Sequence, residues 1–282
     1  MTESELRDFL SSHGLADSQT ALRTLKGGYL NTVWRVDTGD LCFVAKEFAE
    51  PMTGTLFPNL PADEAEALRR LTRLDVAPDL VGFWPDASLL VYDFVEGDMW
   101  DGDMAGVARL LLRKEAADPT GFRTVPLTIP DIIAEGDALF ARCTSLLCAS
   151  PPPVADMPPP QKLSLIHTDI GGNLVGEGSG LRLIDWQCPA IGDICEDIYS
   201  FLSPAFQILG ERAPLTDAQV RDFWDALARP DLEERYDLLR PAYAWRFAGY
   251  CAWRADVLED AAICARYRRA LGEELSYMGH QA

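Results

Sequence analysis

The segment Leu165-Ile166-His167-Thr168-Asp169-Ile170-Gly171-Gly172-Asn173 is followed, after a short turn, by Leu183-Ile184-Asp185-Trp186. The runs 173–175 and 181–184 flank the turn Glu177-Gly178-Ser179-Gly180, which predicts an antiparallel hairpin. Asn173 enters the first strand and Asp185 leaves the second, so the hairpin brings both side chains to one end, near Asp169. Oxygen ligands of this kind suit Mg²⁺, which completes its shell with phosphate and water. A third carboxylate there could accept a hydroxyl proton or orient a nucleophile.

Each of these polar residues also has a simpler interpretation. Asp and Asn beside glycines often only cap turns, and for one residue alone that interpretation is favoured. The ordered set of His-x-Asp, Asn and Ile-Asp-Trp around a hairpin favours a functional site instead.

The sequence before this segment has the pattern of a small antiparallel sheet. Residues 33–36 and 41–48 predict a hairpin, 62–74 a helix, and 81–83 and 88–95 two more strands. Glu96-Gly97-Asp98 breaks the pattern, and the chain beyond it is mainly helical. Helices are predicted at 103–117, 130–149, 193–208, 216–228, 231–259 and 260–277. We therefore expect an α+β protein with a β-rich N-terminal lobe (1–96) and a mainly helical C-terminal lobe (97–282).

The motifs resemble a known family. His167-Thr168-Asp169 with Asn173, then Ile184-Asp185-Trp186, is similar to the catalytic loop and metal-binding motif of the aminoglycoside phosphotransferase/choline kinase family. Gly192-Asp193 with Asp197 resembles the segment that usually follows. The resemblance spans about residues 25–202 and implies a protein-kinase-like two-lobed fold. It also implies that Asp169 is the catalytic aspartate, that Asn173 and Asp185 hold Mg²⁺, and that His167 braces the loop without transferring protons.

The N-terminal lobe carries matching features. Gly27 and Gly28 precede a strand, where a plain turn is the alternative, and they resemble the phosphate-covering loop of choline-kinase-like proteins. Lys46 alternates onto the face of Cys42 and Val44, an unusual place for a solvated lysine, although it could be a snorkelling edge lysine. The resemblance makes Lys46 the residue that contacts the ATP phosphates. Its predicted helix partner is Glu64, with Glu66 as the competitor.

The strand 90–97 resembles the hinge that holds adenine in this family, with backbone groups near Asp93, Phe94 and Val95 binding the base. Three departures are visible. Three residues instead of the usual four separate Asp169 from Asn173. Gln187 stands where many relatives carry an acidic residue, and the helix ending at Lys114 lacks a histidine often found there.

Composition limits the partners. The 282 residues include 25 Lys and Arg and 44 Asp and Glu, a formal charge of −19 that disfavours nucleic acid and anionic membranes. The 7 cysteines fit neither a zinc site nor a disulfide framework. The polar N-terminus is not a signal peptide, and no apolar run reaches the length of a membrane span. We expect a cytoplasmic monomer or homodimer with free thiols.

The acceptor is the least defined element. Acidic and aromatic side chains gather in the C-terminal part, and a helical core rich in Trp and Tyr is the alternative explanation for most of them. Together with the negative charge they favour a cationic hydroxyl compound such as choline, ethanolamine or an aminoglycoside, while a sugar or nucleoside-like alcohol stays open. The candidate acceptor residues are Asp193, Glu196, Asp197, Tyr243 and Trp245.

These features favour an ATP- and Mg²⁺-dependent kinase that phosphorylates a small-molecule hydroxyl. The alternative is a nucleotide-binding pseudokinase with a regulatory or interaction role, suggested by the shortened loop. A phosphatase-like or nuclease metal site is a weaker third hypothesis, because it leaves Lys46 and the glycine pair unexplained.

Overall fold

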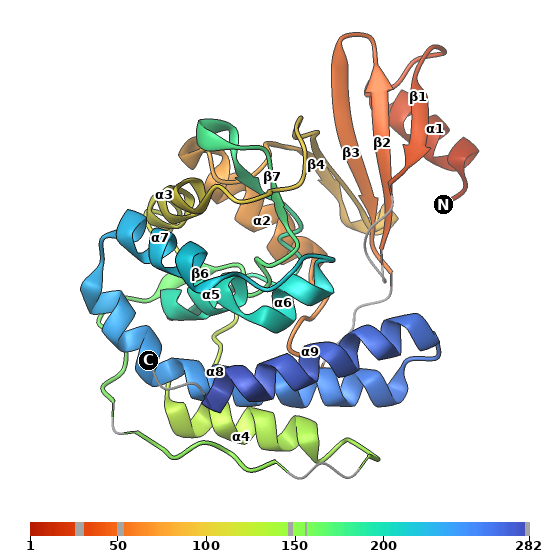
Figure 1. Cartoon of the computed structure of the whole chain (residues 1–282). Coiled ribbons are helices and arrows are strands. Elements are labelled where there is room, and N and C mark those ends of the chain that lie inside the picture. The colour runs from red at the N-terminus through yellow and green to blue at the C-terminus, as the bar shows by residue number, and fades with distance from the viewer. Residues whose placement is uncertain (26–30, 50–53, 146–148, 156, 280–282) are drawn as a thin grey trace.

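An antiparallel sheet and a larger helical body make up the two lobes of this computed structural model, which describes residues 1–25, 31–49, 54–145, 149–155 and 157–279 (Figure 1). The sheet has the order β1-β2-β3-β5-β4, and every neighbouring pair is antiparallel. Its strands are β1 (Ala21–Thr24), β2 (Thr32–Thr38), β3 (Leu41–Glu47), β4 (Leu80–Trp84) and β5 (Leu89–Asp93). The predicted fold class is confirmed.

Alternation along β3 sends its side chains into two cores. Phe43 and Ala45 belong to the core under α1 (Glu3–Ser12), together with Leu6 and Leu10 of that helix. Val44 instead joins the larger core, to which α2 (Pro61–Leu71) contributes its apolar face. Lys46 shares the α2 side of the sheet with Val44, and this placement commits a charged residue to a buried position.

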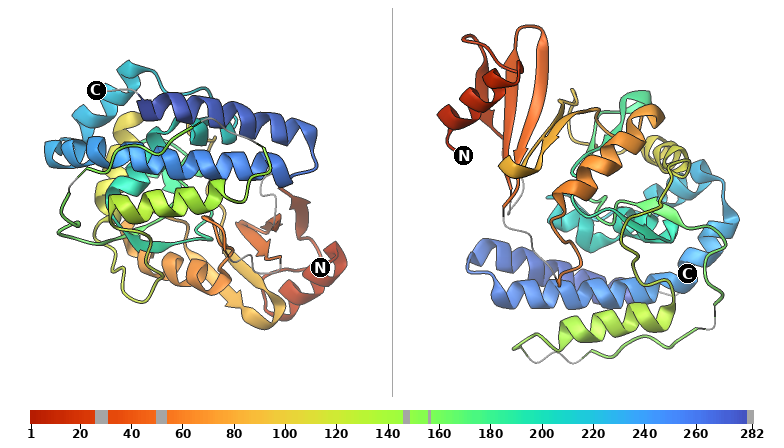
Figure 2. Two further views of the ribbon diagram at one scale, coloured as in Figure 1. Left: turned by 90° about the horizontal axis from the view of Figure 1, so that it is seen from below. Right: turned by 180° about the vertical axis from the view of Figure 1, so that it is seen from behind.

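Helices form most of the C-terminal lobe. Three of them lie side by side at its base, with α8 packed against both α4 and α9 (Figures 1 and 2). The helices are α3 (Met104–Lys114), α4 (Ile129–Phe140), α5 (Ile194–Leu202), α6 (Pro204–Leu209), α7 (Asp217–Leu227), α8 (Pro230–Val257) and α9 (Ala261–Gly279). Within the described residues, no helix combines the length and apolarity needed to cross a membrane.

Two small β-pairs belong to the C-terminal lobe. One joins β6 (Ser164–Ile166) to β9 (Ala190–Gly192), and the other joins β7 (Leu174–Val175) to β8 (Arg182–Leu183). In the second pair Leu174 lies opposite Leu183, the register that the predicted hairpin requires.

The structure departs from the predicted elements in three places. The helix predicted at 193–208 is two helices, α5 and α6, because Ser203 caps a new helix that begins at Pro204. The helix predicted at 130–149 ends at Phe140. Strands β1 and β9 were not predicted, because each is only three or four residues long and has no clear alternation of its own.

Candidate active site

Lys46 connects the two lobes. Its Nζ donates to Oε2 of Glu64 on α2 at 2.6 Å and to Oδ1 of Asp185 in the C-terminal lobe at 2.5 Å. Lys46 is only 2% exposed, so the snorkelling alternative does not apply. Glu66, the competing partner, faces outward and pairs with arginines of its own helix. The predicted lysine and glutamate therefore meet the predicted metal ligand at one point.

The charges at this point stabilise one another. Burial alone lowers the pKa of Lys46, but the carboxylates of Asp185 and Glu64 outweigh it and raise that pKa above its ordinary value. Burial raises the pKa of Glu64 to about 7, against the opposing effect of Lys46. Lys46 therefore keeps its positive charge at a buried position, where its interaction with a phosphate oxygen is stronger than in water.

The hairpin β7–β8 places Asn173 beside Asp185, as the sequence predicted. The backbone N–H of Ile184 donates to the Asn173 carbonyl at 2.9 Å, which sets Asp185 one residue away. The side-chain amide of Asn173 donates to the backbone carbonyl of Asp169 at 2.8 Å. This leaves the amide oxygen of Asn173 on the opposite side of its carboxamide. The three-residue spacing thus still brings Asp169, Asn173 and Asp185 together.

Close packing explains the glycines of the shortened loop. A Cβ on Gly171 would stand 2.6 Å from the Cβ of Phe206 on α6, and one on Gly172 would stand 3.4 Å from the Cα of Gly210. The contact at Gly171 leaves no space for a side chain, whereas the one at Gly172 is close to an ordinary van der Waals contact. The shortened loop therefore packs directly against α6 at Gly171.

The surroundings of Asp169 raise the pKa of its carboxyl group. Burial raises its pKa to about 7, and the negative charge of Asp185 raises it further in the same direction. A carboxylate with a pKa near neutrality accepts a proton more readily than one of ordinary pKa.

His167 joins the two motifs of the site. Its Nδ1 accepts the backbone N–H of Asp169 at 3.2 Å, and its Nε2 lies 3.0 Å from the carbonyl of Ile184, to which it donates. Burial lowers the pKa of His167, so the ring is neutral. With both nitrogens engaged, the ring fits the predicted bracing role and has no free position for proton transfer.

Asp197 is a buried brace, which argues against its predicted contact with the acceptor. It accepts the backbone N–H groups of His167 and Thr168 at 2.9 Å and pairs with Lys114 at 2.8 Å. Both charged side chains are 0% exposed. Thr168 has φ 71°, a costly conformation for a β-branched residue, and Asp197 helps to hold it.

Three further candidate acceptor residues are committed to packing. Asp193 caps α5 through the N–H of Cys195 and pairs with Arg235 at 2.6 Å. Tyr243 is 1% exposed, and Trp245 is 4% exposed with its Nε1 bonded to Asp137. The helical-core alternative describes these aromatic residues, since α8 is covered on both sides by α4 and α9.

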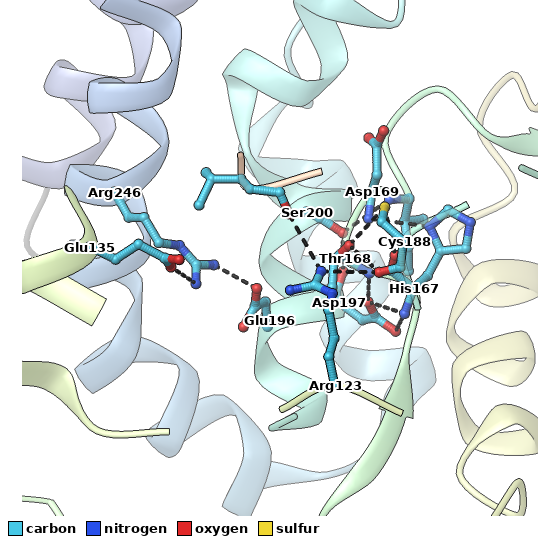
Figure 3. Close-up of polar contacts among 12 residues, drawn as sticks. Arg123, Glu135, His167, Thr168, Asp169, Cys188, Glu196, Asp197, Ser200 and Arg246 are labelled. Carbon is cyan, nitrogen blue, oxygen red and sulfur yellow. Dashed lines mark hydrogen bonds and ion pairs between the residues drawn. The ribbon is translucent and has the colours of Figure 1, made fainter. Parts of the chain in front are cut away.

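Glu196 is the remaining acceptor candidate, and it lines a small cavity beside the catalytic loop. Its Oε1 accepts from Arg246 at 2.6 Å, and Arg246 also reaches Glu135 at 3.2 Å (Figure 3). Burial raises the pKa of Glu196, against the effect of Arg246. The cavity has a volume of about 20 Å³ and is also lined by Arg123, Thr168 and an aromatic wall.

The predicted hinge leaves one backbone donor available. The N–H of Asp93 bonds to the carbonyl of Asp79 and that of Phe94 to the carbonyl of Cys42. The N–H of Val95 has no protein partner in the described parts of the chain. Of the three predicted positions, Val95 therefore best suits recognition of a base edge by its N–H.

Gly27 and Gly28 lie outside the described residues, but Asn31, which follows them, is firmly held. Its Nδ2 donates to Asn59 Oδ1 at 3.1 Å and to Gln187 Oε1 at 3.2 Å, and its Oδ1 accepts from Asn59 at 2.8 Å. Gln187, one of the departures from the family pattern, thus ties the start of β2 to the C-terminal lobe.

Sequence reasoning missed Lys114, Arg123 and Arg246. Lys114 follows Val107, Leu110 and Leu111 at helical spacing, a signal that a charged residue enters the core. Arg246 similarly interrupts an apolar run in α8. Arg123 lies in a loop, and no periodic pattern marks it.

Comparisons with known proteins bear on the fold. No protein-family model matches the sequence, and a search of curated proteins finds no match. Solved structures match over nearly the whole chain. A choline kinase from Streptococcus pneumoniae is 15% identical with a TM-score of 0.66, covering 98% of this chain and 99% of that one.

Two further structures are similar. A choline/ethanolamine kinase family protein from Mesorhizobium loti is 17% identical, with a TM-score of 0.62 and 99% of each chain covered. A spectinomycin phosphotransferase, solved with ADP and spectinomycin, is 11% identical, with a TM-score of 0.63 and 98% of each chain covered. The chain therefore has the protein-kinase-like fold of choline kinases and aminoglycoside phosphotransferases, as the sequence motifs implied.

Proposed function

We propose that this protein is a Mg²⁺- and ATP-dependent phosphotransferase that moves the γ-phosphate of ATP to a hydroxyl group of a small molecule. The observation that carries the proposal is the convergence of Lys46, Glu64 and Asp185 across the two lobes. A lysine that keeps its charge at a buried position, beside a carboxylate suited to a metal, is an arrangement that can hold a nucleotide polyphosphate. The matching solved structures include one titled as a complex with AMP, which supports a nucleotide as the donor.

The donor set fits Mg²⁺ shared with a phosphate. Asp185 is 31% exposed and uses one oxygen for Lys46, which leaves the other open, and the amide oxygen of Asn173 is turned away from Asp169. No group of three or more His, Cys, Asp or Glu residues that could enclose a metal occurs among the described residues. Mg²⁺ binds through one or two protein oxygens together with phosphate and water, which is the number of oxygens that Asp185 and Asn173 offer. Bound there by Asn173 and Asp185, the ion would neutralise phosphate charge.

The remaining chemistry belongs to the chain. Asp169 accepts the proton of the acceptor hydroxyl while the oxygen of that hydroxyl bonds to the γ-phosphorus. The bond between the γ-phosphorus and the β,γ-bridging oxygen breaks at the same time, and ADP is released. Lys46 stabilises the phosphates that remain on the leaving group. His167 and Asp197 hold the backbone of the loop, so that Asp169 stays in position.

The test is coupled ADP release with Mg-ATP and a panel of amino alcohols, hydroxy acids, aminoglycosides, sugars and nucleosides. Asp169→Asn should lower acceptor-dependent turnover by about a hundredfold or more. Asp222→Asn, on the exposed face of α7, serves as the matched control and should leave the rate unchanged.

The same experiment separates the proposal from the pseudokinase alternative. A pseudokinase would gain thermal stability with ATP, yet release no ADP with any acceptor. Turnover that survives Asp169→Asn at the wild-type rate would refute the role assigned to Asp169.

A further inference from the structure

The cavity beside the catalytic loop contains two charged groupings of opposite sign. The first is the triad Glu135–Arg246–Glu196, in which one guanidinium serves two carboxylates at 3.2 and 2.6 Å. The triad has one positive and two negative charges. Glu196 is only 4% exposed, yet its buried Oε2 has no hydrogen-bond partner among the described residues.

Arg123 is the second charged group, and its positive charge has no carboxylate in direct contact, although it lies near enough to Asp63 to oppose the rise that burial causes in the pKa of that half-buried side chain. Its Nη2 donates only to the backbone carbonyls of Leu56 at 3.4 Å and Cys188 at 3.2 Å. Its Nε–H is buried without a partner, and it forms no ion pair with any part of the chain that the structure describes. A partly buried guanidinium in this state is stabilised by a carboxylate or another anion.

These charges face one cavity, and the cavity adjoins the reaction site. Glu196, Arg123 and Thr168 all line it, and Thr168 immediately precedes Asp169 in the sequence. In the view of Figure 3, Arg123 lies between Glu196 and the catalytic loop. The lining of the cavity thus includes a carboxylate with an unpartnered oxygen and a guanidinium with an unpartnered Nε–H, together with aromatic rings.

Resting on the phosphotransferase function proposed above, we propose that the acceptor is a small zwitterion, a hydroxyl compound that carries both a carboxylate and an ammonium group. Arg123 binds the carboxylate, and Glu196 Oε2 binds the ammonium group. This replaces the expectation of a purely cationic acceptor, since the carboxylates here already share Arg246 and such an acceptor would leave Arg123 without an anion in direct contact, with only the nearby Asp63 to offset its charge.

The cavity is smaller than any such acceptor and must widen to admit one. A volume of about 20 Å³ holds roughly one water molecule, so an acceptor enters only where the wall yields. Phe57 is the aromatic wall residue supplied by a loop instead of a helix. It packs edge-on against Phe206, Phe247 and Tyr250 with ring centroids 5.0 to 6.0 Å apart.

A matched series of acceptors tests the proposal. L-homoserine carries both charges, 3-amino-1-propanol lacks only its carboxylate, and 4-hydroxybutyrate lacks only its ammonium group. L-serine, ethanolamine and 3-hydroxypropionate form a shorter series. Coupled ADP release should give a zwitterion about 10- to 100-fold higher kcat/KM than either of its fragments, as expected for one hydrogen bond to a charged group.

Variants assign the effect to Arg123. Arg123→Gln should raise the KM for the preferred zwitterion about 10- to 100-fold, with little change for the amino alcohol or in the KM for ATP. Arg123→Lys keeps the charge and should restore part of the loss. Arg109→Gln, on the exposed part of α3, is the control and should change neither constant.

The outcomes separate this proposal from the phosphotransferase function. An amino alcohol or sugar that matches or exceeds every zwitterion, with turnover dependent on Asp169, overturns the zwitterion and leaves the kinase. An equal loss for all acceptors in Arg123→Gln, with a lowered Tm, assigns Arg123 to structure and overturns the proposal. If nothing turns over, calorimetric titration of L-homoserine and L-serine into the complex with a non-hydrolysable ATP analogue decides: Arg123-dependent binding supports the site, and no binding overturns it.

Discussion

Replacing Lys114 with methionine should destabilise the C-terminal lobe by about 4 kcal/mol. The ammonium group of Lys114 lies 2.8 Å from Asp197 and 2.6 Å from the carbonyl of Leu165, and both charged side chains are 0% exposed. Removing one partner of a buried ion pair costs about 3 to 5 kcal/mol, because the other charge stays buried without compensation. The hydrogen bonds that Asp197 accepts from the N–H groups of His167 and Thr168 reduce this cost, whereas the loss of the hydrogen bond to Leu165 increases it.

A double-mutant cycle measures the interaction itself. Urea denaturation of wild type, Lys114→Met, Asp197→Asn and the double variant should give a coupling energy of at least about 1 kcal/mol, since the second substitution removes the charge that the first left unpaired. Lys162→Met is the control: that lysine also donates to a backbone carbonyl, of Glu115, but it is exposed, and its loss should cost less than about 0.5 kcal/mol. Additive effects, or a Lys114→Met loss no larger than that of the control, would refute the bracing role.

Three further predictions concern the loop, the core and the cavity. Gly171→Ala should cost about 1 to 3 kcal/mol in unfolding free energy and lower kcat, because its Cβ meets Phe206, whereas Gly180→Ala, with open space around it, should change little. Burial raises the pKa of Glu274 to about 7 from 4.5, so its contribution to stability is complete below pH 4.5 and is lost as the pH rises through 7. Denaturation of Glu274→Gln at pH 5 and pH 8 should therefore show the variant gaining about 3 kcal/mol relative to wild type at the higher pH, and an unchanged difference would contradict this. Phe57→Ala should raise kcat/KM about tenfold for acceptors one or two methylenes longer than the preferred one, and unchanged selectivity would exclude Phe57 as the limiting wall.

The parts of the site that sequence predicted depend on short-range geometry. Asn173 and Asp185 are brought together by one hairpin, whose pairing follows from its own apolar runs and turn. Lys46 was located by strand alternation, because its neighbours on the same face are apolar and an exposed lysine does not fit that pattern. Neither inference needed knowledge of how the lobes pack.

The acceptor residues could not be predicted in the same way, because their roles depend on partners far away in the sequence. Asp197 looked available for a substrate, but Lys114 of α3 takes its charge. Tyr243 and Trp245 suit an aromatic cage as well as a core, and only the packing of α8 between α4 and α9 decides between the two. Amino-acid type alone does not say which side of a helix faces solvent when the helix is aromatic almost all round.

The departures from the family pattern leave the arrangement of the candidate site intact. Gly171 has no room for a side chain beside Phe206, so the fold requires glycine there and the shortened loop is packed in place. Gln187, which stands where many relatives carry an acidic residue, accepts a hydrogen bond from the side-chain amide of Asn31 just before β2. Both changes preserve the meeting of Asp169, Asn173 and Asp185 with Lys46, which is the arrangement that the proposed phosphotransferase function requires.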